Sequence, residues 1–260
     1  MPPESLDDPL YDSKYQAYLV QQNEIDSIAT RFTISNYNFK NVIKDWILSD
    51  FYRANGLKNA SYSRERMAAL EDIGIVRMLS PEQLERKVTA IFGMPWGHLK
   101  DQTAMLYGGI DSKEVTERAV APSGAMGAIQ RTLANDVACR NVALDFSRKK
   151  TERILFPDIE TDAIPGESDV SDRKIRAAIV HLHQLVLGRD DDDKSIEVAR
   201  TFELFSGVIT DAQKRGRFDE REIWSCRQGL EKTVPDPHYT VRAWRAVLTY
   251  LLRQHEFLYE

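Results

Sequence analysis

Signals for helix starts recur along this chain, and a long amphipathic run follows most of them. Three segments, Ser80–Gln83, Asp111–Glu114 and Asp219–Glu222, place a side-chain acceptor three residues before Glu or Gln. With this spacing, two side chains at the start of a helix satisfy backbone N–H groups that would otherwise lack partners. No run of alternating β-branched residues competes with the helical pattern. The sequence therefore predicts an all-α protein, with about eight to ten helices around one core.

Apolar periodicity places the main helices. The clearest run is 39–54, in which apolar residues recur at i, i+3, i+4 and i+7 from Phe39 to Phe51. Glycines close several runs at the position favoured for helix ends. The predicted helices are 13–30, 39–54, 81–92, 123–146, 171–187, 195–215 and 239–254, with short helices after Asp111 and Asp219.

Charge and hydropathy exclude two classes of partner. The 260 residues carry a net charge of −5, and no basic stripe follows one face, so we do not expect nucleic-acid binding. No apolar stretch approaches the roughly 18 residues that a membrane span requires. Hydrophobic residues make up 42% and charged residues 29%, the balance of an ordinary globular protein.

The best internal boundary is the polar, acidic segment 157–170, which contains Pro157, Pro165 and Gly166. It predicts an N-terminal helical lobe over 1–156 and a C-terminal helical lobe over 171–260. One continuous domain is the alternative.

The ends of the chain raise the question of a longer parent. Residues 1–8 are acidic and Pro-rich, and they lack the basic and apolar segments of a signal peptide. The protein is then either cytoplasmic or cut from a longer precursor. The apolar aromatic residues just before Glu260 favour a fragment, because natural termini tend to be polar.

The two cysteines, Cys139 and Cys226, both fall in helical patterns. The simpler interpretation is a pair of buried thiols that pack as small apolar side chains. A disulfide between two helices is the alternative in an oxidising compartment, and a reactive nucleophile is the third possibility. The chain has no CxxCH haem-attachment motif and no CxxC pair, so we expect neither a covalent haem nor a structural zinc, and no cofactor.

The most conspicuous candidate metal site is the acidic run Asp190, Asp191, Asp192 and Asp193. Carboxylates are ligands for Ca²⁺, but the run lacks the Gly and Glu positions of a calcium loop. The alternative is a solvated turn that favours the start of the next helix. His181 and His183 are two apart on a helix, so they point to different faces and we do not expect them to share a metal.

The middle of the chain holds the candidate catalytic and ligand-binding residues. Asp111, Glu114 and Glu117 could form a pair of catalytic carboxylates, or they could cap a helix and interact with its dipole. Trp96 and Tyr107 flank glycine-rich loops and could bind a ligand. The alternative for both aromatic residues is to anchor a loop to the core.

Three segments, 36–53, 106–118 and 242–259, resemble helical domains of unknown function in large envelope proteins of planctomycetes and myxobacteria. In those proteins the domains often accompany a c-type cytochrome domain. The resemblance implies an extracytoplasmic or periplasmic location and a larger parent chain. It implies no catalytic residue, and this chain itself lacks a haem motif.

These observations lead to one main hypothesis and two alternatives. The main hypothesis is a non-catalytic helical scaffold or interaction module of a larger bacterial envelope protein, whose partners are other domains of the parent, among them a c-type cytochrome. The first alternative is a hydrolase-type cleft enzyme that uses the carboxylates near residues 96–117. The second is a helical domain that binds a small ligand.

Overall fold

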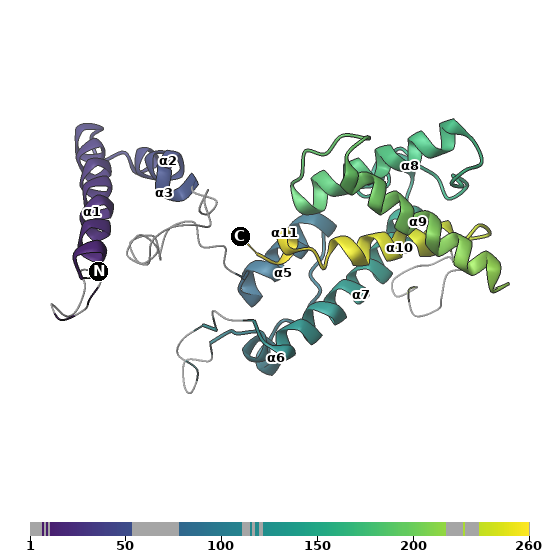
Figure 1. Ribbon diagram of the computed structural model, residues 1–260, viewed down its shortest axis with the longest axis horizontal. Coiled ribbons are helices and arrows are strands. Elements are labelled where there is room, and N and C mark those ends of the chain that lie inside the picture. Colours follow the sequence, from purple (N-terminus) through teal and green to yellow (C-terminus); the bar gives the residue numbers. More distant parts are fainter. Residues whose placement is uncertain are drawn as a thin grey trace. The chain divides into compact units, whose positions relative to one another are not determined.

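The structure is a computed structural model that describes residues 7, 9, 11–53, 78–110, 115, 118–119, 122–216, 226 and 234–259. Within these residues it is built from helices and contains no β-strand, which confirms the predicted all-α class. The chain divides into two compact units, unit 1 (Met1–Arg77) and unit 2 (Met78–Glu260) (Figure 1). None of the described helices is long and apolar enough to cross a membrane.

Unit 1 contains a helical hairpin. Its helices are α1 (Tyr11–Ile34), α2 (Phe39–Leu48) and α3 (Asp50–Arg53). The turn between α1 and α2 holds Asn36 and Tyr37 in left-handed conformations, and Asn38 caps α2 by accepting a hydrogen bond from the backbone N–H of Lys40. Nε of Arg31 on α1 lies 2.8 Å from Oδ2 of Asp45 on α2, so an ion pair joins the two helices.

The predicted helix 39–54 is interrupted at Ser49, so the prediction of one continuous helix is wrong there. Ser49 adopts an extended conformation, with ψ of 152°. Its hydroxyl donates to the carbonyl of Trp46 at 2.7 Å and accepts from the backbone N–H of Tyr52 at 3.3 Å. A serine side chain that bonds to the backbone in this way competes with helical hydrogen bonds.

Unit 2 carries the remaining described helices. They are α5 (Pro81–Phe92), α6 (Asp101–Leu106), α7 (Gly124–Ser147), the 3-10 turn η1 (Lys150–Glu152), α8 (Asp169–Leu182), the π-helical turn η2 (His183–Leu187), α9 (Ile196–Lys214), α10 (Thr240–Leu251) and α11 (His255–Leu258).

The capping box predicted at Ser80 is confirmed. The Ser80 hydroxyl accepts from the N–H of Gln83, whose side chain accepts from the N–H of Ser80. Gly93 ends α5 in a left-handed conformation, with φ of 75°. The capping boxes predicted at Asp111 and Asp219, with the short helices after them, lie outside the described residues.

The core of unit 2 is organised by α10, which contacts both α7 and α9 (Figure 1). The Trp244 side chain of α10 is fully buried. Its ring centroid lies 4.4 Å from that of Phe205 on α9 and 5.1 Å from that of Phe156. The Phe156 ring in turn stacks on Phe146 of α7 at 4.4 Å. A continuous set of aromatic contacts therefore joins the three helices.

Residues 157–170 do not separate two lobes in this arrangement, because α7 before them and α10 after them share one core. The segment itself is anchored, with Ile159 and Ala163 buried in the core cluster. Just before it, the buried carboxylate of Asp145 accepts three backbone N–H groups, from Ile154, Leu155 and Phe156. The division of the chain falls instead between Arg77 and Met78.

The first and last described residues of unit 2 lie side by side. Met78 and Tyr259 form an isolated antiparallel bridge, and the N–H of Leu79 donates to the carbonyl of Leu258 at 2.9 Å. Nζ of Lys87 on α5 also donates to the carbonyls of Glu256 and Phe257, both at 3.0 Å. The start of unit 2 is thereby fixed to its end.

Candidate functional site

Trp96 anchors the loop between α5 and α6 to α7. Its side chain is buried, and its Nε1 donates to Oδ2 of Asp136 on α7 at 3.1 Å. One turn further along α7, Nη2 of Arg140 donates to the carbonyl of Pro95 at 3.0 Å. Burial lowers the pKa of Arg140 from the usual range of arginine, although acidic neighbours oppose the shift. Trp96 therefore anchors the loop to the core. Ligand binding was the other role predicted for it.

Tyr107 is also a core residue. Its side chain is fully buried, and its hydroxyl accepts a hydrogen bond from Nε2 of Gln130 at 3.0 Å. Burial raises the pKa of Tyr107, and the bond from Gln130 offsets only part of the rise. The next two residues are glycines at a crowded turn: a Cβ on Gly109 would lie 2.8 Å from the carbonyl oxygen of Ala104. Tyr107 thus holds the end of α6 against α7.

The carboxylates of the hydrolase hypothesis, Asp111, Glu114 and Glu117, lie outside the described residues. Their proximity to one another therefore stays a prediction. The two aromatic residues proposed to accompany them, Trp96 and Tyr107, are occupied in packing and hydrogen bonding as described above.

The acidic run Asp190–Asp193 forms a turn between η2 and α9. No group of three metal-ligating side chains occurs among the residues that the structure describes. Oδ1 of Asp192 accepts from the backbone N–H of Lys194 at 2.8 Å, and Ser195 caps α9 by accepting from the N–H of Val198. Asp190, Asp192 and Asp193 are exposed. These three aspartates therefore agree with the alternative interpretation, a solvated turn that favours the start of the next helix.

Asp191 differs from its neighbours because it contacts a buried histidine. Nδ1–H of His183 donates to Oδ2 of Asp191 at 2.7 Å, and Nε2 of His183 lies 3.0 Å from Oγ1 of Thr201 on α9. An acid, a histidine and a hydroxyl in series are typical of nucleophilic catalysis. Here both His183 and Thr201 are only 1% exposed, so a substrate cannot reach the hydroxyl. The cluster instead ties η2 and the acidic turn to α9.

Sequence reasoning missed this cluster, although one signal was present. His183 falls in the apolar stripe formed by Ile179, Leu182 and Val186. A histidine in such a stripe becomes buried, and a buried imidazole requires polar partners. The acidic turn eight residues later supplies one of them.

A second polar group links the acidic turn to α11. Nε of Arg189 donates to Oε1 of Glu256 at 2.9 Å, and Nη1 of Arg189 lies 3.7 Å from Oε2 of Glu197 on α9. Burial opposes ionisation of Glu256, but the hydrogen bond and charge of Arg189 outweigh it, so the pKa of Glu256 is lowered. These contacts are structural, since each charge is already matched by another.

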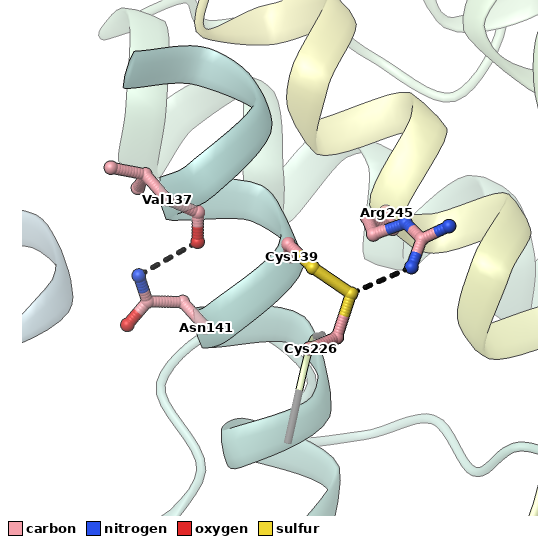
Figure 2. Close-up of a disulfide and its surroundings, with 5 residues drawn as sticks. All are labelled: Val137, Cys139, Asn141, Cys226 and Arg245. Carbon is pink, nitrogen blue, oxygen red and sulfur yellow. Dashed lines mark hydrogen bonds between the residues drawn. A yellow bond between two sulfur atoms is a disulfide. The ribbon is translucent and has the colours of Figure 1, made fainter. Parts of the chain in front are cut away.

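The two cysteines are joined. Cys139 on α7 and Cys226, 87 residues apart, form a disulfide, so the interpretation as two separate thiols is wrong and the expectation of a disulfide is confirmed (Figure 2). Cys226 is 1% exposed, whereas Cys139 is partly exposed. Nη1 of Arg245 on α10 donates to Sγ of Cys226 at 2.8 Å. The disulfide and this bond connect α7, position 226 and α10.

An open groove runs along α9. It has a volume of about 460 Å³, and its lining includes Leu204, Val208, Asp211, Arg215 and Tyr239. Of its three charged lining residues, Asp211 and Arg215 pair with each other, since Nε of Arg215 lies 3.0 Å from Oδ1 of Asp211, and Glu203 is exposed. Specific recognition of a small molecule requires polar groups that converge on it. The small-ligand hypothesis therefore gains no support from this groove.

Unit 1 presents an apolar surface, which we call the α2 face. It consists of Phe39, Ile43, Trp46 and Ile47, which lie at helical spacing and are 64%, 49%, 44% and 44% exposed. Ile28 is the one buried apolar side chain among the described residues of unit 1. The predicted apolar periodicity is therefore present, but the described residues of unit 1 do not cover it.

No family model matches this chain, and no curated protein or solved structure matches it either.

Proposed function

We propose that this chain is a non-catalytic helical interaction module of an extracytoplasmic protein. The observation that carries the proposal is the α2 face, where four large apolar side chains remain exposed at helical spacing. Exposed apolar patches with an aromatic centre are typical of surfaces that bind other proteins. Trp46 would act as the central anchor, because tryptophan is enriched among the residues that dominate binding energy.

The described polar clusters of unit 2 support the non-catalytic part of the proposal. The side chains of Trp96, Tyr107 and His183 make internal contacts that hold helices together. Each is buried, so none of these three can contact a substrate.

The disulfide supports the extracytoplasmic part. Disulfides persist in secreted and periplasmic proteins and are rare in the reducing cytosol. The resemblance to envelope domains that accompany c-type cytochromes makes a cytochrome domain of the parent protein the first partner to test.

The test is a photo-cross-linking experiment in the source cell. A photoreactive phenylalanine analogue replaces Ile43 on the α2 face, and in a control protein it replaces Asn23, an exposed polar residue of α1. We expect cross-links to another domain or protein from position 43 and few from position 23. A haem stain of the cross-linked band tests the cytochrome directly.

A substitution separates binding from folding. Ile43→Glu places a charge on the exposed face, so we expect a change in unfolding free energy within about 0.5 kcal/mol. The same change should abolish the cross-link from a probe at position 47. Cross-links confined to the chain itself, or equal from positions 43 and 23, would overturn the proposed role of the α2 face.

A further inference from the structure

The two sulfur atoms of the disulfide lie in different surroundings (Figure 2). Cys139 is partly exposed on α7. Cys226 is buried, and its sulfur accepts a hydrogen bond from the guanidinium of Arg245 on α10. Because Cys139 is the more exposed residue of the two, we expect an external thiol to reach its sulfur more easily than that of Cys226.

The same asymmetry favours one direction of bond cleavage. In thiol–disulfide exchange, the rate rises when the departing sulfur is a stable thiolate. A guanidinium beside a cysteine sulfur stabilises the thiolate form. Burial alone disfavours a thiolate at Cys226, so the case for Cys226 as the leaving sulfur depends on its contact with the guanidinium of Arg245. Cys139 is the better site of attack because it is the more exposed residue.

We propose that Cys139–Cys226 is a directional thiol–disulfide exchange site, attacked by an external thiol at Cys139, with Cys226 leaving as a thiolate paired with Arg245. The inference does not depend on the proposed interaction role of unit 1.

The exchange balances with a thiol as co-reactant. The thiolate of the external reductant forms a bond to Sγ of Cys139, the Cys139–Cys226 bond breaks, and its electron pair goes to Sγ of Cys226. A second thiolate then attacks the external sulfur and releases Cys139 as a thiolate. In sum, the cystine gains two electrons, and two thiols are oxidised to one disulfide.

Arg245 would also act in the reverse direction. It lies on α10, which packs against α7, the helix that carries Cys139. A Cys226 thiolate held by Arg245 stays close to α7 and is already in its nucleophilic form. Reoxidation should then be faster than for a pair without the guanidinium.

The first experiment uses the unmodified chain with glutathione as the probe. The reaction is quenched with acid at short times, newly formed thiols are alkylated, and the position of each adduct is mapped by peptide mass spectrometry. We expect glutathione on Cys139 and the alkyl group on Cys226, in an excess of about tenfold over the opposite pattern. An equal distribution, or glutathione mainly on Cys226, would overturn the direction.

The second experiment compares three variants in dithiothreitol. Arg245→Gln should slow the first reduction step about five- to tenfold because the leaving thiolate loses its cation, and Arg245→Lys should restore part of the rate. Arg131→Gln is the matched control, because Arg131 is exposed on α7 and its loss changes the net charge equally. Circular dichroism establishes that each variant is folded.

A spectroscopic reading distinguishes this role from a structural one. In the reduced protein, the ultraviolet absorbance of the thiolate should appear at lower pH with Arg245 present than in Arg245→Gln. Equal reduction rates and equal thiolate titration in the two proteins would overturn the part assigned to Arg245. If Arg245→Gln does not fold, the Lys variant and the adduct map of the unmodified chain decide the matter.

Discussion

Nδ1 of His183 lies 2.7 Å from Oδ2 of Asp191, which joins the last turn before the acidic run to the run itself. The other imidazole nitrogen contacts Thr201, so one buried side chain connects η2, the turn and α9. Four adjacent aspartates look like a uniform solvated turn in the sequence. In the folded protein one of them is a specific partner of the core.

Replacing His183 should destabilise the folded protein. His183→Ala leaves a cavity and removes a hydrogen-bond partner from both Asp191 and Thr201, so we expect a loss of about 2–4 kcal/mol in the free energy of unfolding. Urea denaturation measures it. His238→Ala is the control, because His238 is exposed and its loss should cost within about 0.5 kcal/mol. A loss of that small size for His183→Ala would contradict the structural role of the cluster.

Trp96 tests the anchoring role against ligand binding. Trp96→Phe keeps most of the packing and loses the bond to Asp136, so it should cost about 1 kcal/mol. Trp96→Ala also removes the buried ring and should cost about 3–5 kcal/mol. Thermal and chemical unfolding give both values. An Ala variant as stable as the parent would show that Trp96 does not anchor the loop and would revive its candidacy as a ligand-binding residue.

Two glycines should respond oppositely to alanine. A methyl group at Gly109 would lie 2.8 Å from the carbonyl oxygen of Ala104, and relieving that contact requires backbone movement, so Gly109→Ala should destabilise by about 1–3 kcal/mol. Gly127 lies inside α7 with no atom within 4 Å of such a methyl group. Gly127→Ala should therefore stabilise by about 0.5–1 kcal/mol through helix propensity. Denaturation midpoints of the two variants, measured together, test the sign of each effect.

The Arg189–Glu256 pair should make the free energy of unfolding depend on pH in the acidic range. Because the folded pKa of Glu256 is below its usual value of 4.5, the pair contributes stability above that value and loses it as the pH falls through the folded pKa. The Glu256 side chain is 39% exposed, so solvent screening limits the contribution to less than about 1 kcal/mol. Glu256→Gln should be less stable than the parent at neutral pH, and the difference should shrink in acid.

The control for this measurement is Glu167→Gln, since Glu167 is exposed in the segment before α8. Its unfolding free energy at neutral pH should lie within about 0.5 kcal/mol of that of the parent, as for other exposed substitutions. A gap between parent and Glu256→Gln that stays constant from neutral pH into acid would contradict a lowered pKa for Glu256.

Local signals in the sequence predicted much of the helical content. Ser80 with Gln83, and Gly93 at the end of the same helix, are features in which a few neighbouring residues determine the backbone. The break at Ser49 was missed because the apolar spacing continues across it, and the decisive event is the bond of one hydroxyl to the Trp46 carbonyl.

Contacts between residues that are distant in the chain were harder to predict from the sequence. The pairing of Cys139 with Cys226 depends on how the chain returns to α7, and the spacing of two cysteines does not encode that path. For Trp96 and Tyr107 the sequence left two possible roles, binding a ligand or anchoring a loop to the core. Only their partners on α7, Asp136 and Gln130, decide between them.

The pairing of Met78 with Tyr259 has a topological consequence. A unit whose first and last residues are neighbours can be inserted between two consecutive residues of another fold while barely separating them. It can equally be cut at an exposed turn and rejoined between 259 and 78 by a short linker. Tension applied to both ends would then act first on this short pairing, before the helices of the core are loaded.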